Sequence, residues 1–137
     1  MSAIVSFYGN SGSGKTTLIE SCVRELKKKG FTVAVIKHAH HGFEMDKPGK
    51  DSWRFAQAGT DIVAVSSPGR LAVIERVDGE LYYDQVISRI DGKVDIILVE
   101  GFKQLCKVKV EVSDSENIKD VGKIVDFLIE QIQKSKK

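Results

Sequence analysis

A glycine-rich stretch near the amino terminus contains the residues whose types and spacing could do chemistry. It fits the pattern G-x-x-x-x-G-K-[ST], in which Lys15 precedes Thr16. Glycines let a loop approach a phosphate closely, and consecutive main-chain N–H groups then form an anion-binding nest. The lysine reaches the β- and γ-phosphates, and the threonine hydroxyl binds Mg²⁺. The stretch therefore predicts a site for a purine nucleoside triphosphate with Mg²⁺, formed by Gly9, Asn10, Ser11, Gly12, Ser13, Gly14, Lys15 and Thr16.

A carboxylate at the end of an apolar strand would complete such a site. Residues 96–99 are continuously apolar, and Glu100 follows them. Strand ends usually face the ligand side of an open parallel sheet, so Glu100 could hold a magnesium-bound water or orient an attacking water. The alternative for Glu100 is a strand-end carboxylate that binds no ligand. Asp95 lies at the other end of the strand and is a weaker candidate for the magnesium site. Lys15 and Glu100 are thus the predicted catalytic residues, and Thr16 and Glu100 the predicted magnesium-binding residues.

The elements around the glycine-rich stretch support this interpretation. Residues 3–8 are typical of a buried strand, residues 15–29 of an amphipathic helix, and residues 31–37 of a second strand. Strand, helix, strand is the βαβ unit, whose two strands run parallel. Helices are also predicted at 51–58 (capped by Asp51), 83–90 and 118–134, and strands at 61–66, 71–77, 95–101 and 107–112. The fold class is α/β: a single-domain P-loop NTPase fold over residues 1–137, with a mostly parallel sheet and helices on both faces.

Composition limits the classes of function. The chain has 137 residues, of which 42% are apolar and 29% charged, as expected for one globular domain. A formal net charge of +2 does not indicate a nucleic-acid partner. Cys22 and Cys106 form no CxxC pair, and free thiols fit a reducing cytoplasm. No leader and no apolar run long enough for a bilayer is visible, so we expect a cytoplasmic protein without a membrane partner.

The polar segment from His38 to Lys50 follows the second strand, so it should lie on the same side of the sheet as the glycine-rich loop. Three interpretations stay open. The segment could be a switch-like lid that contacts the γ-phosphate or a pterin phosphate, a metal site formed by its histidines and Asp46, or a solvated loop. Trp53 and Phe55, and the strand at 71–77, could likewise belong to the core or to a dimer interface.

Several blocks of sequence together resemble the MobB family, the adaptor proteins of molybdopterin-guanine dinucleotide biosynthesis. The P-loop is shared by many families, but the patterns Lys-His-x-His-His and Lys-Asp-Ser-x-Arg are more distinctive. The blocks fall in the family's order and cover about the first three quarters of the chain. They span residues 9–18, 36–41, 48–54, 58–59 and 99–103.

The resemblance implies a GTP-binding homodimer, at most a slow GTPase. It implies that the protein assists the MobA-type molybdopterin guanylyltransferase, with molybdopterin or its dinucleotide as further ligands. For this chain it implies phosphate binding by Gly12, Gly14, Lys15, Thr16 and Thr17, with Glu100 near the metal. It also indicates a second functional cluster, formed by Lys37, His38, His41, Asp51 and Arg54.

Two features of the sequence depart from these expectations. The chain differs from the family pattern after Lys103, and it carries no N-K-x-D pattern for guanine recognition. The preference for GTP over ATP therefore depends on the resemblance alone. The alternative function is a P-loop small-molecule kinase, which would transfer the γ-phosphate of ATP or GTP and would need a base such as Asp46, Asp51 or Glu100.

Overall fold

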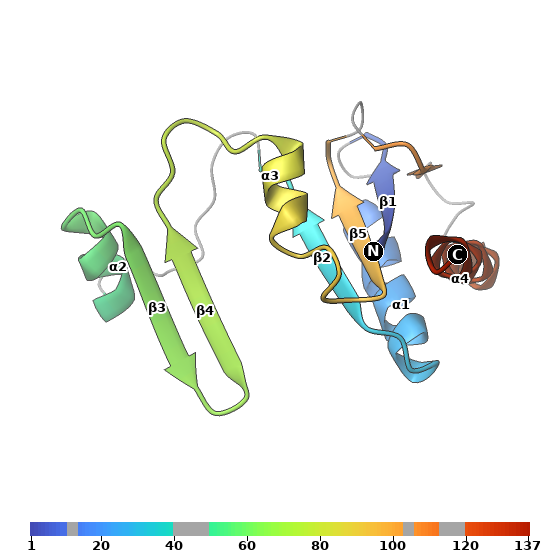
Figure 1. Ribbon diagram of the computed structural model, residues 1–137, viewed down its shortest axis with the longest axis horizontal. Coiled ribbons are helices and arrows are strands. Elements are labelled where there is room, and N and C mark those ends of the chain that lie inside the picture. Colours follow the sequence, from blue (N-terminus) through green and yellow to red (C-terminus); the bar gives the residue numbers. More distant parts are fainter. Residues whose placement is uncertain (11–13, 40–49, 103–105, 113–119) are drawn as a thin grey trace. The chain divides into compact units, whose positions relative to one another are not determined.

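The computed structural model describes residues 1–10, 14–39, 50–102, 106–112 and 120–137 (Figure 1). The chain divides into two compact units. The first unit comprises Met1–Ala39 and Tyr83–Lys137, and the second comprises His40–Tyr82. That residues 1–137 form a single nucleotide-binding domain stays a prediction.

A four-stranded parallel sheet organises the first unit. Its strands are β1 (Ala3–Tyr8), β2 (Val33–Lys37), β5 (Ile96–Glu100) and β6 (Lys109–Glu111), in the order β2-β5-β1-β6. The two central strands, β1 and β5, are the most apolar stretches of the chain, as strands covered on both faces must be. All four strands run in the same direction, so their carboxyl ends meet at one edge of the sheet, called here the carboxyl edge.

Alternation along the strands gives the sheet two apolar faces. Val5, Phe7 and Leu98 belong to a buried cluster with α1 (Lys15–Lys28) and α4 (Val121–Ser135). Ile97 and Val99 point to the other face, where α3 (Tyr83–Ser88) covers them. The predicted α/β fold, with a mostly parallel sheet and helices on both faces, is confirmed. Cys22 of α1 is fully buried, as expected of a small core residue.

The second unit consists of a short helix and a hairpin. The helix is α2 (Asp51–Gln57), and β3 (Ile62–Ser67) pairs with β4 (Arg70–Glu75) as a separate antiparallel sheet. The prediction that Asp51 caps this helix is wrong, because the extended residue before the helix is Lys50 and Asp51 is its first helical residue. A carboxylate in the first turn still suits the positive end of the helix dipole.

Side-chain hydrogen bonds close the opposite, amino edge of the parallel sheet. The Asp95 carboxylate accepts hydrogen bonds from the Thr32 main-chain N–H at 2.8 Å and from its hydroxyl at 3.0 Å. These bonds, with Lys136 3.7 Å away, lower the pKa of the Asp95 carboxyl from its ordinary value. Asp95 therefore ties the start of β5 to the start of β2, and it lies at the end of β5 away from Glu100.

We expect Asp95→Asn to lower the free energy of unfolding by about 1 kcal/mol at pH 7, because the amide cannot accept a charge-assisted hydrogen bond. The pKa of Asp95 is lower in the folded state than in the unfolded state. Its contribution is therefore fully present above the unfolded pKa and is lost as the pH falls through the folded pKa. Urea titrations of both proteins should show the difference shrinking below about pH 4.

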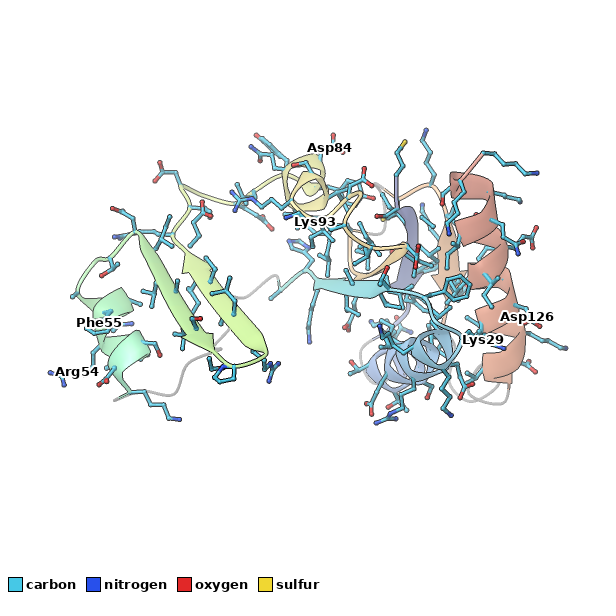
Figure 2. The ribbon with its side chains drawn as sticks, turned by 60° about the horizontal axis from the view of Figure 1, so that its bottom comes forward. Lys29, Arg54, Phe55, Asp84, Lys93 and Asp126 are labelled. Carbon is cyan, nitrogen blue, oxygen red and sulfur yellow. The ribbon has the colours of Figure 1, made fainter. Side chains whose placement is uncertain are left out.

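The matched control is Asp126→Asn, which changes an exposed carboxylate on α4 (Figure 2). It should alter stability by less than about 0.5 kcal/mol at either pH. A difference between wild type and Asp95→Asn that stays constant down to pH 2.5 would contradict the assignment.

Candidate functional site

The loop between β1 and α1 begins at Gly9 and ends at Gly14, on the carboxyl edge of the sheet. Gly14 has a φ of 92°, in the left-handed region that glycine tolerates best, and its carbonyl accepts the N–H of Leu18 at 2.9 Å. The Lys15 ammonium donates to the carbonyl of Gly9 at 2.6 Å. The lysine therefore folds back over its own loop, where a phosphate would lie. Asn10 is exposed, and Ser11, Gly12 and Ser13 fall outside the described residues.

The amino end of α1 has the character that an anion site requires. Within the described residues, no side chain caps this end and its first turn contains no acidic residue. The first N–H groups of a helix have no partner within the helix, and the helix dipole favours negative charge there. Thr16 and Thr17, in the same turn, are exposed. The residues present thus fit a bound triphosphate and a magnesium ion.

Glu100 reaches this edge from the neighbouring strand. It is in register with Phe7 of β1 on one side and with Lys37 of β2 on the other. Ile96 and Leu98 face the cluster that includes α1, so alternation along β5 assigns Glu100 to the same face. The structure therefore brings the predicted carboxylate to the strand next to the glycine-rich loop and to the face that α1 covers.

The turn after Glu100 has an unusual backbone. Gly101 has a φ of 107°, and Phe102 has a φ of 49°, which is rare for a residue with a side chain. Two long-range hydrogen bonds hold the turn. The buried Ser6 hydroxyl donates to the Gly101 carbonyl at 3.0 Å, and the His38 N–H donates to the Glu100 carbonyl at 2.9 Å. Main-chain strain of this kind persists only where the surroundings enforce it, and it clusters at functional sites.

A group of rings packs beside this turn. The imidazole of His38 stacks on Phe102 with a centroid separation of 4.2 Å and an interplanar angle of 18°. Tyr83 contacts Phe102 edge-on at 5.4 Å, and the Cys106 thiol donates to the Tyr83 hydroxyl at 3.3 Å. Burial and the thiol contact raise the pKa of Tyr83. No pattern in the sequence indicates these roles of Ser6, Phe102 and Tyr83, and for His38 the sequence predicts ligand contact only.

The remaining predicted residues fall in different parts of the molecule. Lys37, the exposed last residue of β2, is brought beside Glu100 by the strand pairing. Asp51 belongs to the second unit and lines a pocket of about 640 Å³ with Lys50, Ser52, Phe55 and residues 63–66. Arg54 is exposed and extends from α2 away from the hairpin (Figure 2). His40, His41 and Asp46 lie outside the described residues, so the interpretations of their segment stay predictions.

Within the described residues, no group of three or more histidine, cysteine, aspartate or glutamate side chains is placed to hold a metal ion. The helices in this part of the chain also include none with the length and hydropathy needed to cross a membrane. A magnesium ion at the nucleotide site differs from such a cluster, because phosphates and waters supply most of its ligands.

The family model for molybdopterin guanine dinucleotide synthesis protein B, MobB, matches residues 4–129 of the chain. The chain belongs to the MobB family. Two relatives named molybdopterin-guanine dinucleotide biosynthesis adapter protein support the assignment. The protein from Haemophilus influenzae is 36% identical over 92% of this chain and 71% of its own length. The protein from Escherichia coli is 41% identical over 75% of this chain and 61% of its own length.

Solved structures of MobB proteins share the fold. The crystal structure of Bacillus subtilis MobB is 31% identical, with a TM-score of 0.70 over 86% of this chain and 72% of that one. A crystal structure of molybdopterin-guanine biosynthesis protein B is 27% identical, with a TM-score of 0.75 over 95% and 99% of the two chains. The resemblance inferred from short blocks of sequence is therefore confirmed at the level of family and fold.

Gly101 should be intolerant of a side chain in this MobB protein. A Cβ atom there would lie 2.8 Å from the Cβ of His38, and its φ of 107° is strained for other residues. The contact involves atoms next to the backbone, so relief requires the strands to move apart. We expect Gly101→Ala to lower the free energy of unfolding by about 2–4 kcal/mol in chemical denaturation.

Gly30→Ala is the matched control, because Gly30 has a φ of 89° and nothing lies within 4 Å of its would-be Cβ. Gly30→Ala should lower the free energy of unfolding by about 1 kcal/mol, the cost of the left-handed conformation alone. If Gly101→Ala and Gly30→Ala lost the same free energy of unfolding, the His38 contact would contribute nothing.

Proposed function

We propose that this chain binds GTP with Mg²⁺ and acts as an adaptor in the attachment of GMP to molybdopterin. The observation that carries the proposal is the arrangement at the carboxyl edge of the sheet. There the glycine-rich loop leads into a helix whose amino end no described side chain caps, Lys15 donates to the Gly9 carbonyl, and Glu100 ends the adjacent strand. Membership of the MobB family supplies the pathway, since the relatives are named as adapters of molybdopterin-guanine dinucleotide biosynthesis.

Main-chain N–H groups and the Lys15 side chain are proposed to bind different parts of the triphosphate. Main-chain N–H groups from Gly9 to Thr17 surround the phosphates, together with the side chains of Asn10, Ser11 and Ser13. Lys15 exchanges its bond to the Gly9 carbonyl, 2.6 Å long, for the β- and γ-phosphates. That exchange replaces a neutral acceptor with a charged one and so favours the triphosphate.

Magnesium would be held by the Thr16 hydroxyl and, directly or through a water, by the Glu100 carboxylate. The bound ion neutralises charge on the phosphates. Glu100 is also proposed to orient a water for attack, and the family resemblance implies at most a slow GTPase. Lys37, the last residue of β2, and His38, which follows it, are proposed to contact the nucleotide. Asp51 and Arg54, in the second unit, are proposed as further ligand-contacting residues.

The adaptor role requires a partner enzyme. We propose that the partner is the molybdopterin guanylyltransferase of the MobA type, with molybdopterin or its dinucleotide as further ligands, in the cytoplasm. Purified transferase should be retained by immobilised protein with GTP and Mg²⁺, and much less without nucleotide. Equal retention in both conditions would count against an adaptor. Rapid, acceptor-dependent turnover would instead favour a small-molecule kinase.

The hairpin of the second unit supports a homodimer. Pairing of β3 with β4 places Ile62, Leu71 and Val73 on one face, and they are 57%, 68% and 54% exposed. Apolar residues gathered on one face of a two-stranded sheet mark an interaction surface. We therefore propose that this face is covered by a second copy of the chain.

Lys15→Ala should weaken GTP binding by about 10- to 100-fold, because it removes one charge-assisted hydrogen bond to phosphate. Titration calorimetry with GTP and with ATP, each with and without Mg²⁺, measures the effect and settles the base preference. The matched control is Lys27→Ala, which removes an exposed lysine from the last turn of the same helix. Unchanged affinity in Lys15→Ala would show that the phosphate site is misplaced.

Val73→Lys should convert the dimer to a monomer, because burial of an unpaired charge at the interface costs several kcal/mol. Sedimentation equilibrium at micromolar concentration measures the change. Val35→Lys is the control, since Val35 of β2 is 48% exposed but belongs to the first unit. Dissociation in the control alone would place the interface elsewhere.

A further inference from the structure

We propose that the stacked rings of His38 and Phe102 form a strut that fixes the turn after β5 and so positions the Glu100 carboxylate. The two residues are then positioning residues of the nucleotide site, and Phe102 acts without contacting the ligand. The proposal rests on the proposed function, because it assigns the effect of the strut to magnesium binding by Glu100.

The turn cannot keep its conformation through local preference. Two successive residues, Gly101 and Phe102, have φ values of 107° and 49°. The second is costly for a residue with a Cβ atom, and such strain persists only when surrounding contacts enforce it. Any relaxation of Phe102 would rotate the peptide units before it, including the one that carries Glu100.

Contacts from three other elements enforce the conformation. From β1, the Ser6 hydroxyl donates to the Gly101 carbonyl at 3.0 Å. From the end of β2, the imidazole of His38 stacks on the Phe102 ring at 4.2 Å. From α3, Tyr83 meets the edge of the same ring at 5.4 Å. Phe102 therefore packs between the end of β2 and the start of α3, and its ring is the shared support.

The strut also connects Glu100 to the chain that leaves β2. The His38 N–H donates to the Glu100 carbonyl at 2.9 Å. The missing side chain of Gly101 lets His38 approach, since a Cβ would lie only 2.8 Å from the His38 Cβ. A displacement of His38 would thus pull on the main chain of Glu100 and on the ring beyond it. The Glu100 carboxylate is attached to this main chain through its own side chain, so its position follows that of the turn.

The test compares the magnesium effect, defined as the Kd for GTP without Mg²⁺ divided by the Kd with Mg²⁺. We expect Phe102→Leu to reduce the magnesium effect by about five- to tenfold and to leave the magnesium-free Kd within about twofold. Phe102→Tyr retains a stacking ring and should retain the effect. Phe127→Leu is the matched control, because Phe127, a residue of α4, packs on the other core cluster.

A double-variant cycle separates positioning from general loosening. In the Glu100→Gln background, Phe102→Leu should change the magnesium effect no further, because the group that it positions is gone. The proposal would be overturned if the reductions of the magnesium effect by Glu100→Gln and Phe102→Leu were additive. It would also be overturned if Phe127→Leu reduced the magnesium effect as much as Phe102→Leu does.

Amide hydrogen exchange gives a readout that needs no nucleotide. Phe102→Leu should accelerate exchange of the His38 N–H by about tenfold or more, while Phe127→Leu should not. If exchange changes as expected but wild-type protein binds no GTP, the proposed function fails and the strut stands. If GTP binds and the His38 N–H stays protected in Phe102→Leu, the strut fails and the proposed function stands.

Discussion

The parallel pairing of β1 with β5 is the interaction on which the candidate site depends. The register runs from Ala3 opposite Ile96 to Phe7 opposite Glu100, and residues 96–99 are fully buried. Burial of apolar side chains on both faces selects this register, since a slip of one residue would exchange the faces of every side chain. The same register sets Glu100 beside the strand that leads into Gly9. Hydrophobic burial thus determines where a polar site is assembled.

Much of the fold could be predicted because the elements have clear periods. The helix predicted over 15–29 is Lys15–Lys28, and the strand predicted over 3–8 is Ala3–Tyr8. The order of the strands could not be predicted, because a period of two residues shows that a strand is half-buried and not which strand it pairs with. For the same reason, the separate sheet of β3 and β4 was not anticipated. The strand predicted over 107–112 is only Lys109–Glu111, since its pairing with β1 ends at Tyr8.

The candidate site was predictable only where its chemistry is local in sequence. The glycine-rich loop is contiguous, and Glu100 follows an apolar run, so both could be found from the chain alone. Ser6 and Gly101 are 95 residues apart in the sequence, and no pattern of residue types predicts the hydrogen bond between them. The left-handed conformation of Phe102 is equally hidden, because phenylalanine has no preference for it. The Ser6–Gly101 hydrogen bond and the conformation of Phe102 both depend on tertiary contacts, which the sequence alone does not specify.

The two edges of the parallel sheet show a division between stability and function. At the amino edge, the Ser2 hydroxyl donates to the Val94 carbonyl at 2.5 Å and accepts the N–H of Gly92 at 3.0 Å. Thr32 and Asp95 add three more hydrogen bonds between β2 and β5. The carboxyl edge instead holds a strained turn and a helix end that no described side chain caps, which are individually unfavourable. Strain of this kind is tolerated where other parts of the fold offset it. The hydrogen-bonded amino edge anchors the strands from one end, so the opposite end can keep the geometry of the candidate site.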